Sequence, residues 1–300
     1  MYAIAFHPNY VYPIPDHHRF PMEKYRLLPQ QLMHQGIVTA EQFFEPGLVD
    51  VKHVIAVHDA DYIHRFLQQE LTYHEVRRIG FEPSNLLVER ELTLVQGTIE
   101  GAKRALQDGI AFNIAGGTHH ACYAHGEGFC MINDQAVAAQ YLINTGLAQR
   151  VLIVDLDVHQ GNGTADLLGQ SEAIFTFSMH CEKNYPFIKA KSHLDVGLEM
   201  GTEDATYLSL LKQHYYGLLD SFQPDFIFYQ AGVDILSTDK MGKLACTLSG
   251  CLQRDEMVIG AAFQRDIPMQ VSMGGGYSPA IKTILDAHTQ TFTVANRYFY

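Results

Sequence analysis

The sequence is poor in basic residues and contains no long apolar run. Only 21 Lys and Arg stand against 33 Asp and Glu, and the formal net charge is −12. This imbalance argues against a partner held through phosphate contacts, so we expect no nucleic acid partner. No apolar stretch approaches the roughly 20 residues that a membrane-spanning helix requires, so we expect no membrane partner.

Cysteine is also scarce. The five cysteines form no Cys-x-x-Cys pair and are odd in number, which gives no sign of a disulfide framework. Residues 1–15 lack the basic start, apolar stretch and small-residue cleavage site of a secretory signal. We therefore expect reduced thiols and a cytoplasmic location.

Neither repeats nor linkers divide the chain, so we expect residues 1–300 to form a single domain. Apolar runs typical of strands alternate with amphipathic segments typical of helices. The expected strands are 2–6, 53–57, 110–115, 151–155, 173–178, 225–230 and 268–272. The expected helices are 91–106, 134–144, 203–221 and 254–264, the third with Thr202 as its N-cap. The alternation predicts an α/β fold, with a mostly parallel sheet covered by helices on both faces.

The segment VLIVDLDVHQGNG, residues 151–163, carries the strongest chemical signal. Asp155, Asp157 and His159 follow a buried strand at a spacing of two, which places them on one face of an extended chain. Two carboxylates and an imidazole are costly to bury there unless they bind something. A divalent metal is the simplest such partner. The segment therefore predicts a metal-dependent hydrolase.

Four of the expected strands end in small residues followed by reactive side chains, and the carboxyl ends of parallel strands share one edge of the sheet. We predict Asp157, His159 and Asp234 as metal ligands. Three protein ligands leave a position open for water and a substrate oxygen. Two oxygens and one nitrogen suit Zn²⁺ and also allow Fe²⁺. For an isolated Asp-x-His, a helix cap and a core histidine would be the simpler interpretation.

Three further side chains follow the strand ends. His119 and His120 follow a Gly-Gly turn, and one of them could act as general base and later protonate a leaving amine. Tyr277 follows three glycines, and its phenol could donate to a carbonyl oxygen that gains negative charge. The alternative for these residues is simple packing at a pocket rim or a strand end. Asp155 either orients a histidine or binds a monovalent cation.

Together, these motifs resemble the histone deacetylase family of the arginase–deacetylase fold, over most of the chain. The likeness rests on the order and spacing of the runs His119-His120-Ala121, Gly128-Phe129-Cys130, Asp155 to Gly163, Ser178-Met179-His180, Gly232-Val233-Asp234, Lys240-Met241-Gly242 and Gly274-Gly275-Gly276-Tyr277. The run Gln160-Gly161-Asn162-Gly163 and the start at Gly201 resemble the fourth class and its bacterial relatives.

The resemblance implies Zn²⁺ as the metal, with Tyr277 as the group that polarises the carbonyl. It implies His120 as the principal base and acid, with His119 beside it and paired with Asp155. A structural K⁺ is implied at Asp155, Ser178 and the backbone of Asp157, His159 and Met179. A narrow tunnel for an acyl-lysine chain is implied, with substrate contacts at Gly128, Phe129, Tyr185, Met241 and Gly275.

The chain departs from the family pattern in two places. Asn162 stands where many deacetylases have an aspartate that partners the second histidine. Because a neutral amide stabilises a protonated imidazole less than a carboxylate does, we predict a lower pKa for His120 than in aspartate-bearing relatives. The segment 80–88 offers no match to the rim aspartate that grips the substrate backbone in some classes.

The expected reaction is hydrolysis of ε-acyl-lysine, with an acetyl or a longer fatty acyl group, by metal-activated water. An alternative within the same chemistry is the hydrolysis of acetylpolyamines or other small N-acyl amines. A ureohydrolase with two metals is more remote, because Gln160 stands where a second metal would need a further ligand. The last alternative is a binding module for acylated ligands, against which the two histidines argue, since binding needs no proton shuttle.

Overall fold

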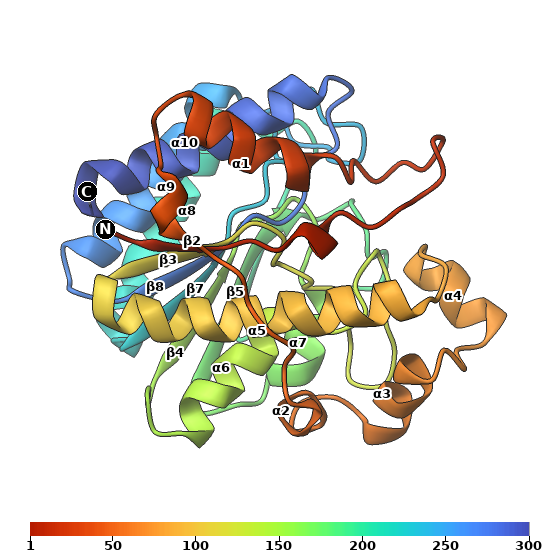
Figure 1. Ribbon diagram of the computed structural model, residues 1–300. Coiled ribbons are helices and arrows are strands. Elements are labelled where there is room, and N and C mark those ends of the chain that lie inside the picture. The colour runs from red at the N-terminus through yellow and green to blue at the C-terminus, as the bar shows by residue number, and fades with distance from the viewer. Residues whose placement is uncertain (300) are drawn as a thin grey trace.

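One eight-stranded sheet organises the molecule in this computed structural model, which describes residues 1–299 (Figure 1). The strand order is β2-β1-β3-β8-β7-β4-β5-β6, and every pairing between these strands is parallel. The strands are β1 (Ala3–Ala5), β2 (Phe43–Phe44), β3 (Ile110–Asn113), β4 (Val151–Asp155), β5 (Ile174–Cys181), β6 (Leu194–Leu198), β7 (Phe226–Gln230) and β8 (Met269–Ser272).

Helices cover both faces of the sheet. In Figure 1, α1, α8, α9 and α10 lie on one face, and α5, α6 and α7 lie on the other. The α-helices are α1 (Lys24–His34), α2 (Val51–Ile55), α3 (Ala60–Leu67), α4 (Tyr73–Ile79), α5 (Asn85–Asp108), α6 (Asp134–Asn144), α7 (Asn162–Leu168), α8 (Asp204–Phe222), α9 (Leu248–Phe263) and α10 (Ile281–Phe299). Two short 3-10 helices are η1 (Pro8–Tyr10) and η2 (Ala40–Gln42). The α/β architecture with a parallel sheet is thus confirmed.

The register of the sheet separates an apolar row from a polar row. Across five neighbouring strands, one row consists of Phe112, Val271, Tyr229, Val154 and Phe177. The next row toward the carboxyl ends consists of Asn113, Ser272, Gln230, Asp155 and Ser178. The change from one row to the next places the boundary between core and site at a single residue step.

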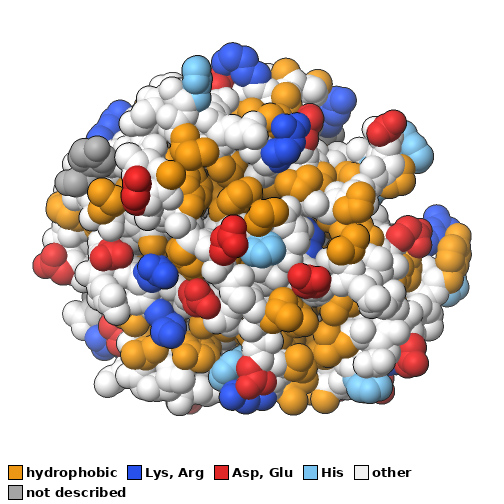
Figure 2. Space-filling view, viewed as in Figure 1, with side chains coloured by type: hydrophobic (Ala, Val, Ile, Leu, Met, Phe, Trp, Pro, Cys, Tyr) orange, Lys and Arg blue, Asp and Glu red, His pale blue; other side chains and the backbone are white. Residues whose placement is uncertain are grey.

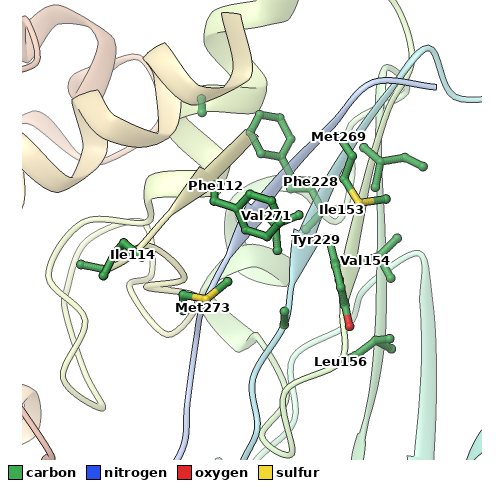
Figure 3. Close-up of a cluster of buried hydrophobic side chains, with 14 of the residues drawn as sticks. Phe112, Ile114, Ile153, Val154, Leu156, Phe228, Tyr229, Met269, Val271 and Met273 are labelled. Atoms are coloured by element: carbon green, nitrogen blue, oxygen red, sulfur yellow. The ribbon is translucent and has the colours of Figure 1, made fainter. Parts of the chain in front are cut away.

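The apolar row belongs to the core shown in Figure 3, where side chains of β3, β4, β7 and β8 pack together. All five residues of β4 are buried, as expected for a strand that is covered on both faces. The ring of Phe112 stacks on that of Phe292 in α10, with centroids 4.2 Å apart, and lies 5.2 Å from the ring of Tyr2. These contacts join the first strand, the centre of the sheet and the last helix.

Six of the seven expected strands and all four expected helices are present, with shifted ends in most cases. The expected strand at 53–57 is wrong, because residues 53–55 belong to helix α2, which Asp50 caps by accepting from the backbone N–H of Lys52, and a turn follows. Short apolar runs do not distinguish a strand from a buried helix segment. Strands β2 and β6 were not expected, since β2 has only 2 residues and β6 lies at the sheet edge with most of its side chains partly exposed.

Two helix starts also differ from expectation. Thr202 is not the N-cap of α8, because Glu203 occupies that position and the Thr202 hydroxyl donates to the carbonyl of Glu199 instead. Helix α9 begins at Leu248, six residues before the expected start, because Thr247 caps it by accepting from the N–H of Gly250. All five cysteines are free and buried. No helix among residues 1–299 is long and apolar enough to cross a membrane.

Replacing Phe112 by alanine should lower the free energy of unfolding by about 3–5 kcal/mol, because it removes a fully buried ring from the stack with Phe292. The measurement is urea unfolding followed by circular dichroism. Leu86→Ala is the control, since Leu86 is 57% exposed, and it should change the free energy by less than about 0.5 kcal/mol. Equal losses in the two variants would contradict the assignment of Phe112 to the core.

Candidate active site

The loops that follow β3, β4, β7 and β8 meet at the carboxyl edge of the sheet. The loops after β3, β4 and β8 line a small cavity, and its lining includes the predicted residues His119, His120, Asp157, His159 and Tyr277. The turn before the histidines depends on Gly117, whose φ of +101° is left-handed and whose added Cβ would lie 2.2 Å from Gln230 Oε1. Sequence spacing alone predicted this convergence of four strand ends.

Two carboxylates share one imidazole at the centre of this edge. The Nδ1 atom of His159 lies 3.1 Å from Asp157 Oδ1 and 3.2 Å from Asp234 Oδ2. One ligand atom from each of the three residues lies within 4.8 Å of the others, and all three residues are buried. The backbone of Gly275 approaches both acids closely, since its N–H donates to Asp157 and an added Cβ would lie 2.1 Å from Asp234 Oδ2.

The charges of this cluster are shifted in a way that favours a cation. Burial and the neighbouring carboxylate of Asp157 raise the pKa of Asp234 to about 7. Burial opposes ionisation of Asp157 as well, but contacts with His119 and His159 outweigh it and hold its pKa well below the usual range. Burial lowers the pKa of His159, yet hydrogen bonds to both acids raise it to about 10. The proton on His159 therefore lies where the carboxylates of Asp157 and Asp234 favour a positive charge.

The two consecutive histidines have separate partners. The Nδ1 atom of His119 lies 2.8 Å from Asp155 Oδ2, and the Nδ1 atom of His120 lies 2.7 Å from Asn162 Oδ1. The ring centroids of the pair are 4.1 Å apart. Each partner fixes the direction of one ring, and the Nε2 edge of each ring is left free of these contacts.

The histidine pKa values move in opposite directions. Burial lowers the pKa of His119, but the carboxylates of Asp155 and Asp157 outweigh burial and raise it to about 9. Burial, followed by the charges of His119 and His159, places the pKa of His120 well below its usual value. A divalent cation nearby would lower the pKa values of both histidines, because it disfavours a second positive charge. His120 is therefore the neutral member of the pair and the one able to accept a proton at neutral pH.

Tyr277 closes the cavity opposite the histidines. Its backbone N–H donates to Asp239 Oδ2 at 2.6 Å, and its ring lies 6.1 Å from that of Phe20. Burial and the charges of Asp157 and Asp234 raise the pKa of its phenol, so the phenol stays protonated. The hydroxyl has no hydrogen-bond partner among residues 1–299, which leaves its O–H available to a ligand.

A second cavity of about 300 Å³ leads from this centre toward solvent. His120, His159 and Tyr277 line its deep part. Of the five residues predicted to contact a substrate, the structure places Gly128, Phe129, Tyr185 and Met241 in the lining of this cavity and Gly275 beside the carboxylate cluster. The predicted potassium residues come from neighbouring segments, because Asp155 pairs with Ser178 across β4 and β5 and Met179 follows.

Glu127 is a buried neighbour of the site that sequence reasoning missed. Its Oε1 accepts from Asn162 Nδ2 at 2.6 Å, and its Oε2 accepts from Arg78 Nε at 2.5 Å. Because a carboxylate only accepts hydrogen bonds, this contact fixes the Asn162 amide with Nδ2 toward Glu127 and Oδ1 toward His120. Its signal in the sequence was an acidic residue within the run Gly126 to Cys130, directly after the histidine pair.

Three more charged residues, of which Lys24 and Asp134 are buried and Asp239 is partly buried, hold the loops in place. Asp134 accepts from the backbone N–H groups of Gly117 and Thr118 below the histidines. Lys24 donates to the carbonyl of Gly274 at 2.8 Å, and burial lowers its pKa to about 8. Asp239 accepts the N–H of Tyr277. In the sequence, each looks like an ordinary helix or loop residue, so nothing marked it.

Cys122, His125 and Glu127 form a second group of potential metal ligands near the cavity. Glu127 is already engaged by Asn162 and Arg78. Burial and the charge of Glu127 raise the pKa of the Cys122 thiol to about 12, so the thiol stays protonated at neutral pH. These contacts leave the group without a free anionic ligand, and we assign it no metal.

Comparison with known proteins agrees with this geometry. The family profile described as "Histone deacetylase domain" matches residues 18–292. An uncharacterized protein of Picosynechococcus is 45% identical over 288 residues, covering 96% of each chain. Histone deacetylase 2 of Arabidopsis thaliana is 32% identical over 270 residues, covering 87% of this chain and 70% of that protein.

The solved structure of an HDAC homolog from Aquifex aeolicus superimposes with a TM-score of 0.82 at 21% identity, covering 98% of this chain and 84% of the other. At that identity the likeness speaks for the fold alone. The profile spans most of the chain, and the Arabidopsis relative shares nearly a third of the aligned residues. The chain therefore belongs to the histone deacetylase family.

Proposed function

We propose that this protein is a zinc-dependent amidohydrolase that removes an acyl group from ε-acyl-lysine. The observation that carries the proposal is the buried cluster of Asp157, His159 and Asp234, whose His159 lines a cavity together with the neutral His120 and Tyr277. The side chains of Phe129, Tyr185 and Met241 in the cavity lining suit the apolar stem of an acyl-lysine. Membership of the histone deacetylase family supports hydrolysis of an acyl amide.

The cluster fits one divalent metal ion. Two carboxylate oxygens and one imidazole nitrogen within 4.8 Å form a donor set that Zn²⁺ accepts, and their shifted pKa values show a net demand for positive charge. When bound, such an ion lowers the pKa of a water molecule and polarises an acyl carbonyl. A single ion is favoured, because this donor group contains only three of the described residues and Gln160 donates to Ala190 and Asp195 instead.

The residues of this chain move protons and orient the amide. Neutral His120 accepts the proton of the attacking water at Nε2, because Asn162 holds its Nδ1. The Tyr277 phenol donates to the oxygen that gains negative charge. Protonation of the departing lysine amine by a histidine then breaks the C–N bond and completes hydrolysis. His119 lies beside His120, and its contact with Asp155 favours its protonated form.

A structural K⁺ remains part of this proposal. Asp155, Ser178 and the backbone of Asp157, His159 and Met179 are the residues that would hold it. Asp155 already contacts His119 and the N–H of Asp157, so an ion there would steady both the histidine and the start of the ligand loop.

Loss of a ligand should abolish metal binding. Asp157→Asn and His159→Ala should each bind less than about 0.1 Zn²⁺ per chain after dialysis, against about one for the unaltered protein, measured by elemental analysis. Affinity should rise with pH between 6 and 8, because the metal displaces protons from His159 and Asp234. The control is Asp220→Asn, on the exposed face of α8. Two ions per chain, or full binding by Asp157→Asn, would contradict the assignment.

Removal of the Tyr277 hydroxyl should lower kcat by about 10²–10³-fold with a small change in KM, if the phenol stabilises charge that develops during the reaction. Tyr277→Phe keeps the ring contacts with Phe20 and Phe129. Tyr73→Phe is the control, because Tyr73 is exposed on α4. Steady-state release of acetate from an acetyl-lysine peptide provides the measurement. A Tyr277→Phe enzyme within twofold of the original would remove the phenol from the mechanism.

The negative charge on the Nδ1 side of His120 should determine the pH of the acid limb in the profile of kcat/KM against pH, because His120 must be neutral to accept a proton. Glu127→Gln removes a negative charge from this chain of contacts, so the pKa of His120 falls and the acid limb moves to lower pH. The double variant Asn162→Asp with Glu127→Gln brings the negative charge directly to His120, so the limb moves up by about one pH unit or more.

The double variant is preferable to Asn162→Asp alone. The single change would place two carboxylates where Asn162 Nδ2 and Glu127 Oε1 now lie 2.6 Å apart, and their repulsion would cancel part of the shift. The measurement is kcat/KM against pH, with Glu89→Gln on the exposed face of α5 as control. An acid limb at the same pH in all four proteins would show that His120 is not the group that titrates.

A further inference from the structure

The outer part of the cavity carries two arginines. Arg19 comes from the loop between η1 and α1, and Arg78 comes from the last turn of α4, yet both line the cavity that ends at His120 and Tyr277. In Figure 1 this loop and α4 lie one above the other at the right-hand edge, and Figure 2 shows a notch in the surface between them.

Gly128 and Phe129, which line the cavity, contact both arginines at its outer end, which we call the rim. The Arg19 guanidinium lies 5.4 Å from the ring centroid of Phe129, in a cation–π contact. The backbone carbonyl of Arg78 accepts from the N–H of Gly128, and that of Ile79 accepts from the N–H of Phe129. The side chain of Arg19 and the backbone of Arg78 thus contact the part of the cavity wall formed by Gly128 and Phe129.

The positive charge at the rim is only partly neutralised. Arg19 is exposed and forms no ion pair with any of residues 1–299. Arg78 donates to Glu127 through Nε and Nη2, but its side chain is 52% exposed and its Nη1 has no partner within the described chain. Within the described residues 1–299, no acidic side chain lines this cavity.

An adjoining cavity shares Arg78, Tyr185 and Phe187 with this one, and its lining contains two acids, both of which have partners. Glu127 is buried and accepts from Asn162 and Arg78. Asp166 is exposed and accepts from the backbone N–H of Tyr123. The lining of the cavity thus contains two arginines and no acidic side chain among residues 1–299, although the whole chain carries a formal net charge of −12.

The positions of Arg19 and Arg78 in the cavity determine which part of a substrate they would contact. If the amide lies at the deep end, beside His120 and His159, the carrier of the acyl-lysine lies outside, between Arg19 and Arg78. A guanidinium binds a carboxylate with two parallel hydrogen bonds and repels an ammonium group. Polyamines, which carry several ammonium groups, are disfavoured at such a rim.

We propose that Arg19, together with the free edge of Arg78, binds a carboxylate on the carrier of the acyl-lysine and selects anionic substrates. This inference rests on the proposed lysine deacylase function and specifies its substrate class. The carboxylate has two sources, namely the α-carboxylate of a free ε-acyl-lysine and acidic side chains that flank acyl-lysine in a peptide.

The test uses two matched substrate pairs with the zinc-loaded full chain. One pair is Nα-capped ε-acetyl-lysine as free acid and as amide, and the other is an acetyl-lysine pentapeptide flanked by glutamate or by glutamine. The readout is the ratio of kcat/KM for the anionic over the neutral member at low salt. We expect a ratio of about 3–5 for at least one pair, as for an exposed charge pair, and a decrease as salt is added.

Charge variants connect the ratio to the rim. Arg19→Gln should lower the ratio by about half or more, and Arg19→Glu should lower it below 1. Lys212→Gln, an exposed change of equal charge on α8, should keep the original ratio. Ratios near 1 for both pairs in the original protein, an unchanged ratio in Arg19→Glu, or faster cleavage of acetylated polyamines than of the neutral amide would each overturn the inference.

Failure of the proposed function is a distinct result. If no lysine substrate is cleaved, the deacylase proposal fails, while the rim is still tested by calorimetric titration with the same free acid and amide. Tighter binding of the free acid that Arg19→Glu removes would support the anionic specificity. Equal affinities would overturn it.

Discussion

The structure depends on two buried carboxylates held against one imidazole. Asp157 and Asp234 lie within hydrogen-bond distance of the same His159 nitrogen, where their mutual repulsion and lost hydration are costly. Backbone N–H groups offset part of this cost, since Val158 donates to Asp234 and both His159 and Gly275 donate to Asp157. These backbone hydrogen bonds do not neutralise the negative charge of the two carboxylates. The remaining negative charge raises the pKa of His159 and favours a cation.

Such a cluster requires a rigid support, and the sheet supplies it. The apolar row through Phe112 and Val154 lies one residue before the polar row through Asp155, so the site begins where the core ends. Behind β7, buried Arg254 pairs with Asp255 and donates to the carbonyl of Gly232, two residues before Asp234. The buried Arg254–Asp255 pair therefore holds the loop through a hydrogen bond to the Gly232 carbonyl. Apolar side chains of the same volume could not form this hydrogen bond.

Sequence reasoning could predict those parts of the site that are local in the chain. Asp157 and His159 follow one strand, so their spacing and the buried run before them were enough. Glu127 contacts Asn162, 35 positions away, and Lys24 contacts Gly274, 250 positions away. The residues that flank Glu127 and Lys24 in the sequence do not indicate these partners. Packing between distant segments determines whether a charged side chain is buried and what it contacts. The strand expected at 53–57 is wrong for a different reason, because a short apolar run does not distinguish a strand from a helix segment such as α2.

The contact between Asn162 and the distant Glu127 changes how the role of Asn162 is interpreted. Read alone, a neutral amide behind His120 leaves the imidazole without a negative partner. In the structure the amide lies between His120 and the buried carboxylate of Glu127, so the negative charge is moved one residue farther away and is shared with Arg78. At that distance it orients the amide, and through it the His120 tautomer, while it attracts a proton less strongly than a carboxylate in direct contact. His119, by contrast, touches Asp155 directly. One histidine is therefore kept charged and its neighbour neutral, because one carboxylate is in contact and the other acts through an amide.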